Sequence, residues 1–359
     1  MAAIDALLVA LKERSGSDLH LAAGTPPRLR VKGNLDPIEG QALLTDASLR
    51  ALLREIVSGE QWAEYEAGGD LDFAYGLPGV ARFRANYLVQ QNGAGAVFRI
   101  IPEQILSVEQ LALPPAITKL AELSKGLVLV TGPTGSGKST TLAAIVDHIN
   151  ANHRKHIVTI EDPVEFVHQN KQSVLSHREV GSHTHGFGPA LRAAIRQDAD
   201  VVLVGEMRDR ETIALAITAA EMGMLVFGTL HTNSAAKTID RIIDAFPAKE
   251  QNQVRLSLSE SLAAVVSQLL VPTADGKGRC AVHEILLRNS ALPNIIREGK
   301  VTMLNSLIEG GKAQGMQTMD DTLFALVKAG RIRGSDAFMK ATNKARFESL
   351  AGADEQSAA

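Results

Sequence analysis

The chain has 359 residues, an apolar share of 45% and a charged share of 21%, values typical of a folded globular protein that exclude a disordered or fibrous chain. Its length exceeds what one hydrophobic core usually fills, so we expect two domains. A formal net charge of −3 gives no general attraction to nucleic acid or anionic lipid, and no nucleic-acid partner is predicted. Cys280 is the single cysteine, which excludes an internal disulfide and favours a reducing compartment.

The apolar runs of the sequence are short. None approaches the roughly 20 residues that are needed to span a bilayer. The N-terminal apolar positions are interrupted early by Asp5, whereas a signal peptide begins basic and continues with a solid apolar run. We therefore predict a cytoplasmic protein with no direct membrane insertion.

Residues 1–100 are predicted to form a small α+β domain. It opens with an amphipathic helix, because apolar residues recur there at helical spacing, at Ile4, Leu7, Leu8 and Leu11. Short β-prone segments separated by glycine or proline follow, at residues 29–35 (with a turn at 32–34), 71–75, 82–90 and 94–100. These segments predict one antiparallel sheet packed with helices.

Residues 81–90 alternate with the period of a strand. The alternation places polar side chains on one face, at Arg82, Arg84 and Asn86. It places apolar side chains on the other face, at Phe83, Ala85, Tyr87 and Val89. One face is therefore predicted to be basic and the other to join the core.

Prolines at positions 102, 114 and 115 break the pattern, so residues 101–115 are predicted to be a linker. The following domain, residues 116–350, is expected to hold a parallel sheet flanked by helices, because apolar strands alternate with helical stretches. The strands are expected at residues 127–131, 157–160, 201–204 and 225–230. After Arg255 the pattern is mainly helical, at 256–270 and 302–308, and residues 351–359 are predicted to be a disordered tail.

The strongest motif is a complete G-x-x-x-x-G-K-S between an apolar strand and a helical stretch. Such a loop lets consecutive main-chain N–H groups and a helix N-terminus point at a phosphate. Lys138 would then bridge the β- and γ-phosphates, and the Ser139 hydroxyl would bind magnesium. The predicted nucleotide-binding residues are Gly132, Pro133, Thr134, Gly135, Ser136, Gly137, Lys138, Ser139 and Thr140.

Polar residues also follow the other predicted strands, at the edge where α/β folds bind their ligands. Glu206 ends the strand at 201–204 and is expected to reach the magnesium shell or the attacking water. Glu165 is the candidate for polarising that water, since hydrolysis needs a positioned acceptor. His231 is expected to sense the γ-phosphate through a hydrogen bond. Surface-solvated acids and a structural histidine are the alternatives for these residues.

Taken together, residues 132–139, 161–165, 205–209 and 228–241 resemble the Walker A, Asp box, Walker B and His box of secretion and type IV pilus ATPases. Within that superfamily the sequence looks most like the type IV pilus retraction ATPases. Further matching segments are residues 16–21, 296–298 and 315–318. The resemblance covers nearly the whole chain.

The resemblance implies a PAS-like first domain joined to a RecA-like motor domain, assembled as a homo-hexameric ring that binds ATP with Mg²⁺. It also implies an inner-membrane pilus platform protein as partner, possible contacts with other pilus ATPases, and a place at the inner face of the cell membrane. Three residues look like the family's arginines that reach the phosphates from the first domain: Arg82, Arg84 and Arg99. Surface arginines on a sheet are the alternative interpretation.

The sequence departs from the family pattern at three positions. Gly205 stands where an aspartate is usual, so magnesium on this side is expected to be held through water and Glu206. Met224 replaces a second histidine, and Pro293 replaces an arginine of the retraction signature. The last change puts the strength or partner of retraction in question, and leaves ATP hydrolysis untouched.

Three functions fit the sequence. The first is an ATP-hydrolysing motor that powers pilus retraction and twitching motility. The second is an assembly or type II secretion ATPase, although these usually carry a tetracysteine metal loop that a chain with only Cys280 cannot form. The third is an accessory retraction subunit or a nonhydrolysing scaffold, against which the intact Lys138, Ser139 and Glu206 argue.

Overall fold

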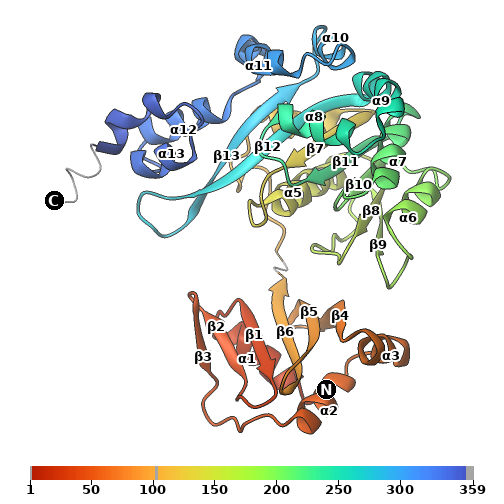
Figure 1. Cartoon of the computed structure of the whole chain (residues 1–359), viewed down its shortest axis with the longest axis vertical. Helices are drawn as coiled ribbons and strands as arrows, with labels where there is room; N and C mark the ends of the chain where they lie inside the picture. The colour runs from red at the N-terminus through yellow and green to blue at the C-terminus, as the bar shows by residue number, and fades with distance from the viewer. Residues whose placement is uncertain (1, 102–103, 353–359) are drawn as a thin grey trace. The chain divides into compact units, whose positions relative to one another are not determined.

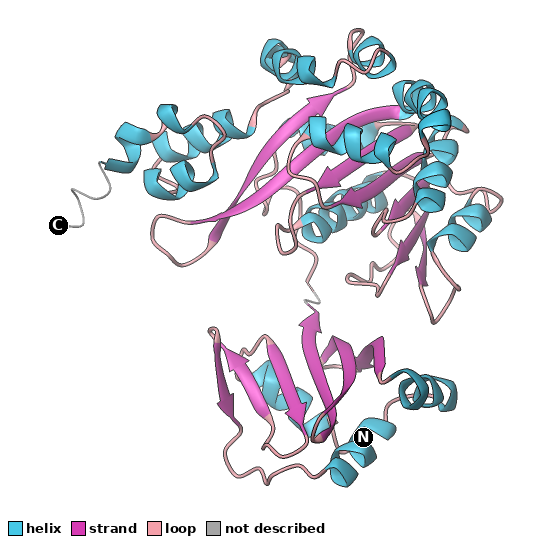
Figure 2. Ribbon diagram, in the orientation of Figure 1, coloured by secondary structure: helices cyan, strands magenta, loops and turns pink. Residues whose placement is uncertain are grey.

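The computed structural model describes residues 2–101 and 104–352. The chain divides into two compact units (Figure 1). The first unit is Met1–Gln104 together with Pro163–Val167, and the second is Ile105–Asp162 together with His168–Ala359. Each unit contains one β-sheet with helices packed against it (Figure 2).

The described part of the first unit has a six-stranded antiparallel sheet in the order β3-β2-β1-β6-β5-β4. Its strands are β1 (Asp18–Ala22), β2 (Arg28–Val31), β3 (Asn34–Pro37), β4 (Asp70–Leu77), β5 (Ala81–Gln90) and β6 (Gly93–Ile101). Its helices are α1 (Asp5–Glu13), α2 (Asp46–Arg54) and α3 (Gly59–Gly68). The predicted antiparallel sheet, the N-terminal amphipathic helix and the turn between β2 and β3 are confirmed.

Local sequence explains these elements. The turn between β2 and β3 fits because Lys32 and Gly33 both adopt positive φ, 50° and 91°, as a tight hairpin requires. Helices α2 and α3 begin at capping boxes, in which the side chains of Thr45 and Ser58 accept hydrogen bonds from the N–H groups of Ser48 and Gln61. These caps supply partners for helix-end amides that would otherwise lack them.

The core of the first unit lies on the apolar face of β5 and β6. Phe83, Ala85 and Tyr87 are fully buried, as their alternation predicts. Val89 was expected on the same face, but half of its surface is exposed. Val89 lies near the end of β5, where its N–H donates to the carbonyl of Gly69, the residue that follows α3.

Tyr87 offers a test of this core. Its hydroxyl donates to the carbonyl of Leu53 at 3.0 Å, so Tyr87→Phe leaves a buried acceptor without its donor and should lower the unfolding free energy of this unit by roughly 1–3 kcal/mol. Trp62 is the only tryptophan of the chain and lies in α3, so urea denaturation followed by its fluorescence reports on this unit. An unchanged midpoint would contradict the described packing.

The described part of the second unit is built on a seven-stranded sheet in the order β13-β12-β7-β11-β10-β8-β9. All neighbours pair in parallel except β12 and β13. The strands are β7 (Gly126–Thr131), β8 (His156–Glu161), β9 (Val174–Glu179), β10 (Val201–Val204), β11 (Leu225–Leu230), β12 (Leu262–Pro272) and β13 (Arg279–Leu287). The predicted α/β class with a parallel sheet is confirmed.

Helices cover both faces of this sheet (Figure 1). The helices described in this unit are α4 (Pro115–Thr118), α5 (Lys138–Asn152), α6 (Phe187–Ala194), α7 (Arg210–Glu221), α8 (Ala235–Asp244), α9 (Ala248–Ser261), α10 (Leu292–Arg297), α11 (Leu304–Gly310), α12 (Met319–Lys328) and α13 (Gly334–Lys340). Val128 and Val130 of β7 belong to one apolar cluster with α5, whereas Leu127 and Leu129 belong to another with α7 and α8. A strand covered on both faces is expected to be continuously apolar, and every residue of β7 is buried.

The predicted helix at residues 256–270 is correct only as far as Ser261 and wrong for the rest. Helix α9 ends at Ser261, and the chain continues as β12, which pairs with β7 on one side and β13 on the other. A fully buried strand shows no polar alternation, so its apolar run cannot be told from a buried helix by period alone. The sequence also gave no sign of β9, whose side chains are mostly half-exposed.

The C-terminal part is helical, as predicted, with residues 302–308 covered by a short 3₁₀ turn (Val301–Met303) and α11. Pro115 is the first residue of α4, at the end of the predicted linker, and part of that linker lies outside the described residues. Of the predicted disordered tail, Ala351 and Gly352 are helical. Residues 353–359 lie outside the described residues.

Candidate active site

Four parallel strands of the second unit end at one edge of the sheet. Their registers pair Thr131 with Leu230, Val204 with Gly228, and Val204 with Ile160. The residues that follow each strand therefore lie side by side along this edge. They are Gly132 after β7, His231 after β11, Gly205 and Glu206 after β10, and Asp162 after β8, whose last residue is Glu161.

The phosphate loop, residues 132–139, joins β7 to α5. Gly132, Gly135 and Gly137 adopt positive φ of 147°, 77° and 85°, conformations that glycine accepts without steric cost. The Lys138 ammonium group donates to the carbonyl oxygens of Gly132 (2.8 Å) and Pro133 (3.2 Å). The lysine is therefore held across the loop, close to the N-terminus of α5.

The loop suits an anion. Ser136 Oγ is buried and has no hydrogen-bond partner among the described residues, a cost that a bound acceptor would remove. Ser139 and Thr140 lie in the first turn of α5, where main-chain N–H groups lack intrahelical acceptors and the helix dipole favours negative charge. These features fit phosphate groups, and Ser139 is placed where a hydroxyl could meet a metal ion that accompanies them.

Glu206 lies in a cluster of opposite charge at the end of β10. Its Oε1 is 2.6 Å from Arg208 Nε and 3.2 Å from His231 Nε2. Burial alone would raise the pKa of Glu206, but the hydrogen bond and charge of Arg208, with His231 and Lys138, outweigh it and lower that pKa. The structure thus brings together two of the predicted site residues, Glu206 and His231, and adds Arg208.

Gly205 occupies the position where the family pattern has an aspartate. A Cβ atom there would lie 3.2 Å from the carbonyl oxygen of Ile160 and 3.3 Å from Glu161 Cα, which is tighter than ordinary contact. The Gly205 N–H also donates to the Ile160 carbonyl at 2.8 Å. Close approach of β8 and β10 therefore suits glycine and leaves Glu206 as the carboxylate at the end of β10.

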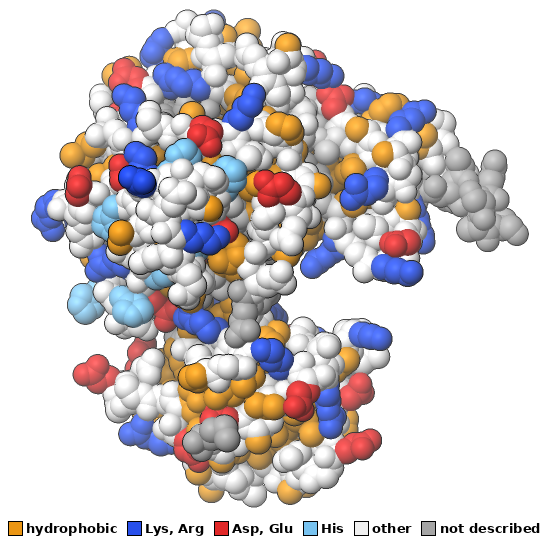
Figure 3. All heavy atoms as spheres, turned by 180° about the vertical axis from the view of Figure 1, so that it is seen from behind, with side chains coloured by type: hydrophobic (Ala, Val, Ile, Leu, Met, Phe, Trp, Pro, Cys, Tyr) orange, Lys and Arg blue, Asp and Glu red, His pale blue; other side chains and the backbone are white. Residues whose placement is uncertain are grey.

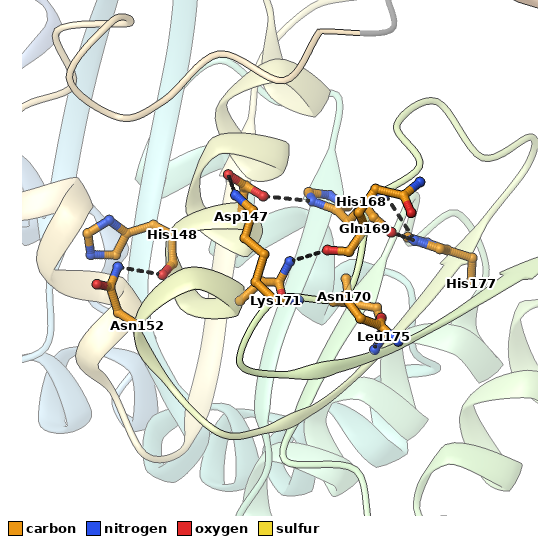
Figure 4. A network of polar contacts seen from close by, with 10 residues as sticks. Asp147, His148, Asn152, His168, Gln169, Asn170, Lys171, Leu175 and His177 are labelled. Atoms are coloured by element: carbon orange, nitrogen blue, oxygen red, sulfur yellow. Dashed lines mark hydrogen bonds and ion pairs between the residues drawn. The ribbon is translucent and has the colours of Figure 1, made fainter. Parts of the chain in front are cut away.

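A second network of polar contacts joins residues 168–171, which follow the Asp box (residues 161–165), to α5 (Figure 4). Asn150 donates to the carbonyl of Gln169 (2.8 Å) and accepts from the N–H of Lys171 (3.0 Å). The Lys171 ammonium lies 2.7 Å from Asp147 Oδ2. These contacts tie residues 169–171 to the helix that follows the phosphate loop.

His168 lies in the same network. It stacks on His177 with ring centroids 5.8 Å apart, and its backbone N–H donates to His177 Nε2. Burial lowers the pKa of His168 to about 4, so this ring is neutral near pH 7. The neutral His168 ring can therefore pack against His177 without the repulsion that two imidazolium ions would cause.

The remaining predicted site residues belong to the first compact unit. Glu165 is exposed and lies in Pro163–Val167. Arg84 and Arg99 are direct cross-strand partners on β5 and β6, and Arg82 shares their face. Within the unit, Arg99 Nε donates to Asp18 at 2.7 Å, and Arg84 lies 3.8 Å from Asp72. The roles of Glu165 and the three arginines at the phosphates stay predictions.

The other two departures from the family pattern are accommodated by the fold. Met224 is buried in an apolar cluster just before β11 begins. His231 follows the opposite end of the same strand, so position 224 lies away from the phosphate edge. Pro293 stands in the first turn of α10, where proline leaves no helical hydrogen bond unmade.

The structure also places three residues near the loop that sequence reasoning missed. Gln268 donates to the carbonyl of Ser136, His283 contacts Gln268, and the Ser267 hydroxyl lies 2.9 Å from that of Thr131. All three belong to β12 and β13. No signal was available for them, because the segment with Gln268 was expected to be a helix.

Among the described residues, no helix has both the length and the apolar character needed to cross a bilayer. Acidic and basic side chains are interspersed over the face of the second unit seen in Figure 3.

The fold and the phosphate loop define a P-loop nucleoside triphosphatase with a parallel-core sheet. A family model described as "Type II/IV secretion system protein" matches residues 3–322, and the chain belongs to this family.

Individual relatives are similar over nearly the full length. The type IV pilus retraction ATPase PilT of Pseudomonas aeruginosa is 50% identical over 343 residues, 94% of this chain and 98% of that protein. The type IV pilus ATPase PilU of the same organism is 41% identical over 335 residues, 93% of this chain and 87% of that protein. The crystal structure of the pilus retraction motor PilT with bound ADP matches with a TM-score of 0.88 and 42% identity, covering 96% and 98% of the two chains.

The charge cluster at Glu206 predicts a pH effect. Arg208→Ala should raise the pKa of Glu206, because it removes the hydrogen bond and positive charge that counteract the effect of burial. The acidic limb of the pH profile of nucleotide hydrolysis should therefore move to higher pH. Rates of phosphate release measured across the pH range give the position of this limb. Arg210→Ala is the matched control, because Arg210 pairs with Glu250 at 2.6 Å. Coincident limbs in wild type and Arg208→Ala would show that Glu206 does not set that limb.

Proposed function

We infer that this chain is an ATP-hydrolysing motor that powers retraction of a type IV pilus. The observation that carries this inference is the phosphate loop with Lys138 and the Glu206 cluster on one sheet edge. They occur in a chain that is 50% identical to a retraction ATPase over 98% of that protein's length. Fold, site and relatives all agree with this function.

The site residues have distinct roles in hydrolysis. The phosphate loop holds the β-phosphate through main-chain N–H groups, and Lys138 neutralises charge on the phosphate oxygens. The Glu206 carboxylate, whose pKa is lowered, is ionised near pH 7 and accepts a proton from the water that attacks the γ-phosphorus. The bond from phosphorus to the β–γ bridging oxygen breaks, and ADP leaves with the electron pair.

The predicted magnesium ion fits the same edge. It would be held by the Ser139 hydroxyl and, through water, by Glu206. When bound, magnesium neutralises charge on the β- and γ-phosphate oxygens. Glu165 is proposed to help polarise the water and His231 to sense the γ-phosphate through its position beside Glu206.

Retraction is favoured over the other functions. The identity to the retraction ATPase of Pseudomonas aeruginosa is 50%, against 41% to PilU of the same organism. Assembly and type II secretion ATPases usually carry a tetracysteine metal loop, and this chain has only Cys280. An accessory retraction subunit is the second candidate, since the similarity to PilU also spans 93% of the chain.

The working form is proposed to be a homo-hexamer in the cytoplasm, acting on an inner-membrane platform protein at the inner face of the membrane. Arg82, Arg84 and Arg99 are proposed to contribute positive charge to a bound triphosphate. Their placement on a single face of the first unit supports this proposal. Arginines that neutralise transition-state charge can be worth roughly 10³ to 10⁵ in rate.

The catalytic assignment is tested by Glu206→Gln. This change removes the proton acceptor and keeps the phosphate loop, so turnover should fall by roughly tenfold or more while ADP affinity stays near that of the wild type. Steady-state phosphate release and titration with a fluorescent ADP analogue measure the two quantities. Lys138→Ala is the reference for a disabled loop and should lose both. Wild-type turnover in Glu206→Gln would remove Glu206 from the mechanism.

The cellular function is tested by deleting the gene. Loss of a retraction motor should leave excess surface pili and abolish twitching, because assembly continues while disassembly stops. Complementation with the wild-type gene should restore twitching, and complementation with Lys138→Ala should not. Cells without pili would point instead to an assembly ATPase.

A further inference from the structure

Gln268 of β12 contacts the phosphate loop and is almost fully buried. Its Nε2 donates to the carbonyl of Ser136 at 2.7 Å. Its Oε1 accepts from the Thr141 hydroxyl of α5 at 2.8 Å. One side chain thus holds both the loop and the first turns of the helix that follows it.

Two glycines of the loop pack against this residue. A Cβ atom on Gly132 would lie 2.2 Å from the carbonyl oxygen of Gln268, and one on Gly137 would lie 2.9 Å from its Nε2. Neither position has room for a side chain while Gln268 keeps its place. The path of the phosphate loop is therefore shaped by contact with Gln268 as well as by positive φ.

The neighbouring strand fixes which way the amide of Gln268 points. His283 of β13 pairs with Gln268 across the sheet, and its Nε2 lies 3.1 Å from Gln268 Oε1. Burial lowers the pKa of His283 to about 4, so the ring is neutral near pH 7, and the tautomer with its proton on Nε2 donates to Gln268 Oε1. A flipped amide would set Oε1 against the Ser136 carbonyl, where two acceptors repel each other.

His283 is in turn attached to the segment around residues 315–318, which the sequence analysis singled out without a role. The carbonyl of His283 accepts from Gln317 Nε2 (3.1 Å) and from the Thr322 hydroxyl (2.7 Å). Gln317 also forms a two-way backbone bridge with Ile285. Helix α12 is thereby seated on β13 at the residue that orients Gln268.

We propose that Gln268 is a positioning residue for the phosphate loop, oriented by His283, and that residues 317–322 act on nucleotide binding by holding His283 in place. Gln268 touches no substrate and acts through the carbonyl of Ser136 and the hydroxyl of Thr141. Since the loop carries the amides that face the β-phosphate, its displacement weakens binding of nucleotides that possess one. The proposal rests on the nucleotide site described above and extends it to β12, β13 and α12.

The first experiment measures ADP and AMP affinity of the full chain carrying Gln268→Met, which keeps the length of the side chain and removes both hydrogen bonds. ADP affinity should fall by about tenfold or more, because a small displacement of the phosphate loop weakens its contacts with the β-phosphate. AMP has no β-phosphate, and its affinity should fall much less. The exposed Gln314 supplies the matched control, Gln314→Met. Equal losses for ADP and AMP, or ADP affinity like that of the wild type, would overturn the proposal.

Gln268→Glu serves as a second variant if the methionine variant does not fold. It is nearly isosteric, but it turns an acceptor toward the Ser136 carbonyl, so it should lower ADP affinity at least as much as Gln268→Met. Thermal unfolding without nucleotide checks that each variant is folded. Unchanged ADP binding in a folded Gln268→Glu protein would also refute the proposal. A wild-type chain that binds no ADP would instead count against the proposed function.

The role of His283 is tested by a double-mutant cycle with His283→Phe. If His283 acts only by orienting Gln268, the single change weakens ADP binding and adds nothing in the Gln268→Met background. Independent, additive losses would show that His283 does not act through Gln268. A single His283→Phe variant with wild-type ADP affinity would lead to the same conclusion.

Discussion

Parallel pairing of β7, β11, β10 and β8 brings the ends of these strands to one edge of a sheet, and the site depends on that pairing. Residues separated by up to a hundred positions meet there because the four strands run in the same direction, and β7, β10 and β11 are each followed by a helix. The sheet is buried on both faces, so a shift of one strand would expose apolar residues as well as separate Glu206 from the phosphate loop.

The position of the phosphate loop depends both on its own backbone conformation and on contacts with neighbouring residues. Gly132, Gly135 and Gly137 adopt positive φ, but these conformations do not by themselves fix the position of the loop. The Lys138 ammonium group donates to two carbonyl oxygens of the loop, and the Gln268 side chain donates to the carbonyl of Ser136. The antiparallel pair β12–β13 therefore joins the nucleotide site to the C-terminal helices.

Much of this was visible in the sequence, and the failures have physical causes. Strand β7, the phosphate loop and α5 could be predicted, because the spacing of glycines and the period of apolar residues are local properties of the sequence. The strand β12 was not, since a buried apolar run looks alike in either conformation. The contacts of Arg208, Gln268 and His283 depend on strand register between segments far apart in the chain, which no local pattern records. Gly205 is explained by the close approach of β8, a feature that only coordinates reveal.

We infer that main-chain amides of the phosphate loop hold the β-phosphate of a bound nucleotide and that β12 supports the loop. Hydrogen–deuterium exchange of the full chain, with and without saturating ADP and magnesium, tests it most directly because it reads the amides themselves. ADP binding should slow exchange in peptides covering residues 132–141 and, to a smaller extent, across β12. Exchange in both segments that is unaffected by bound ADP would contradict it.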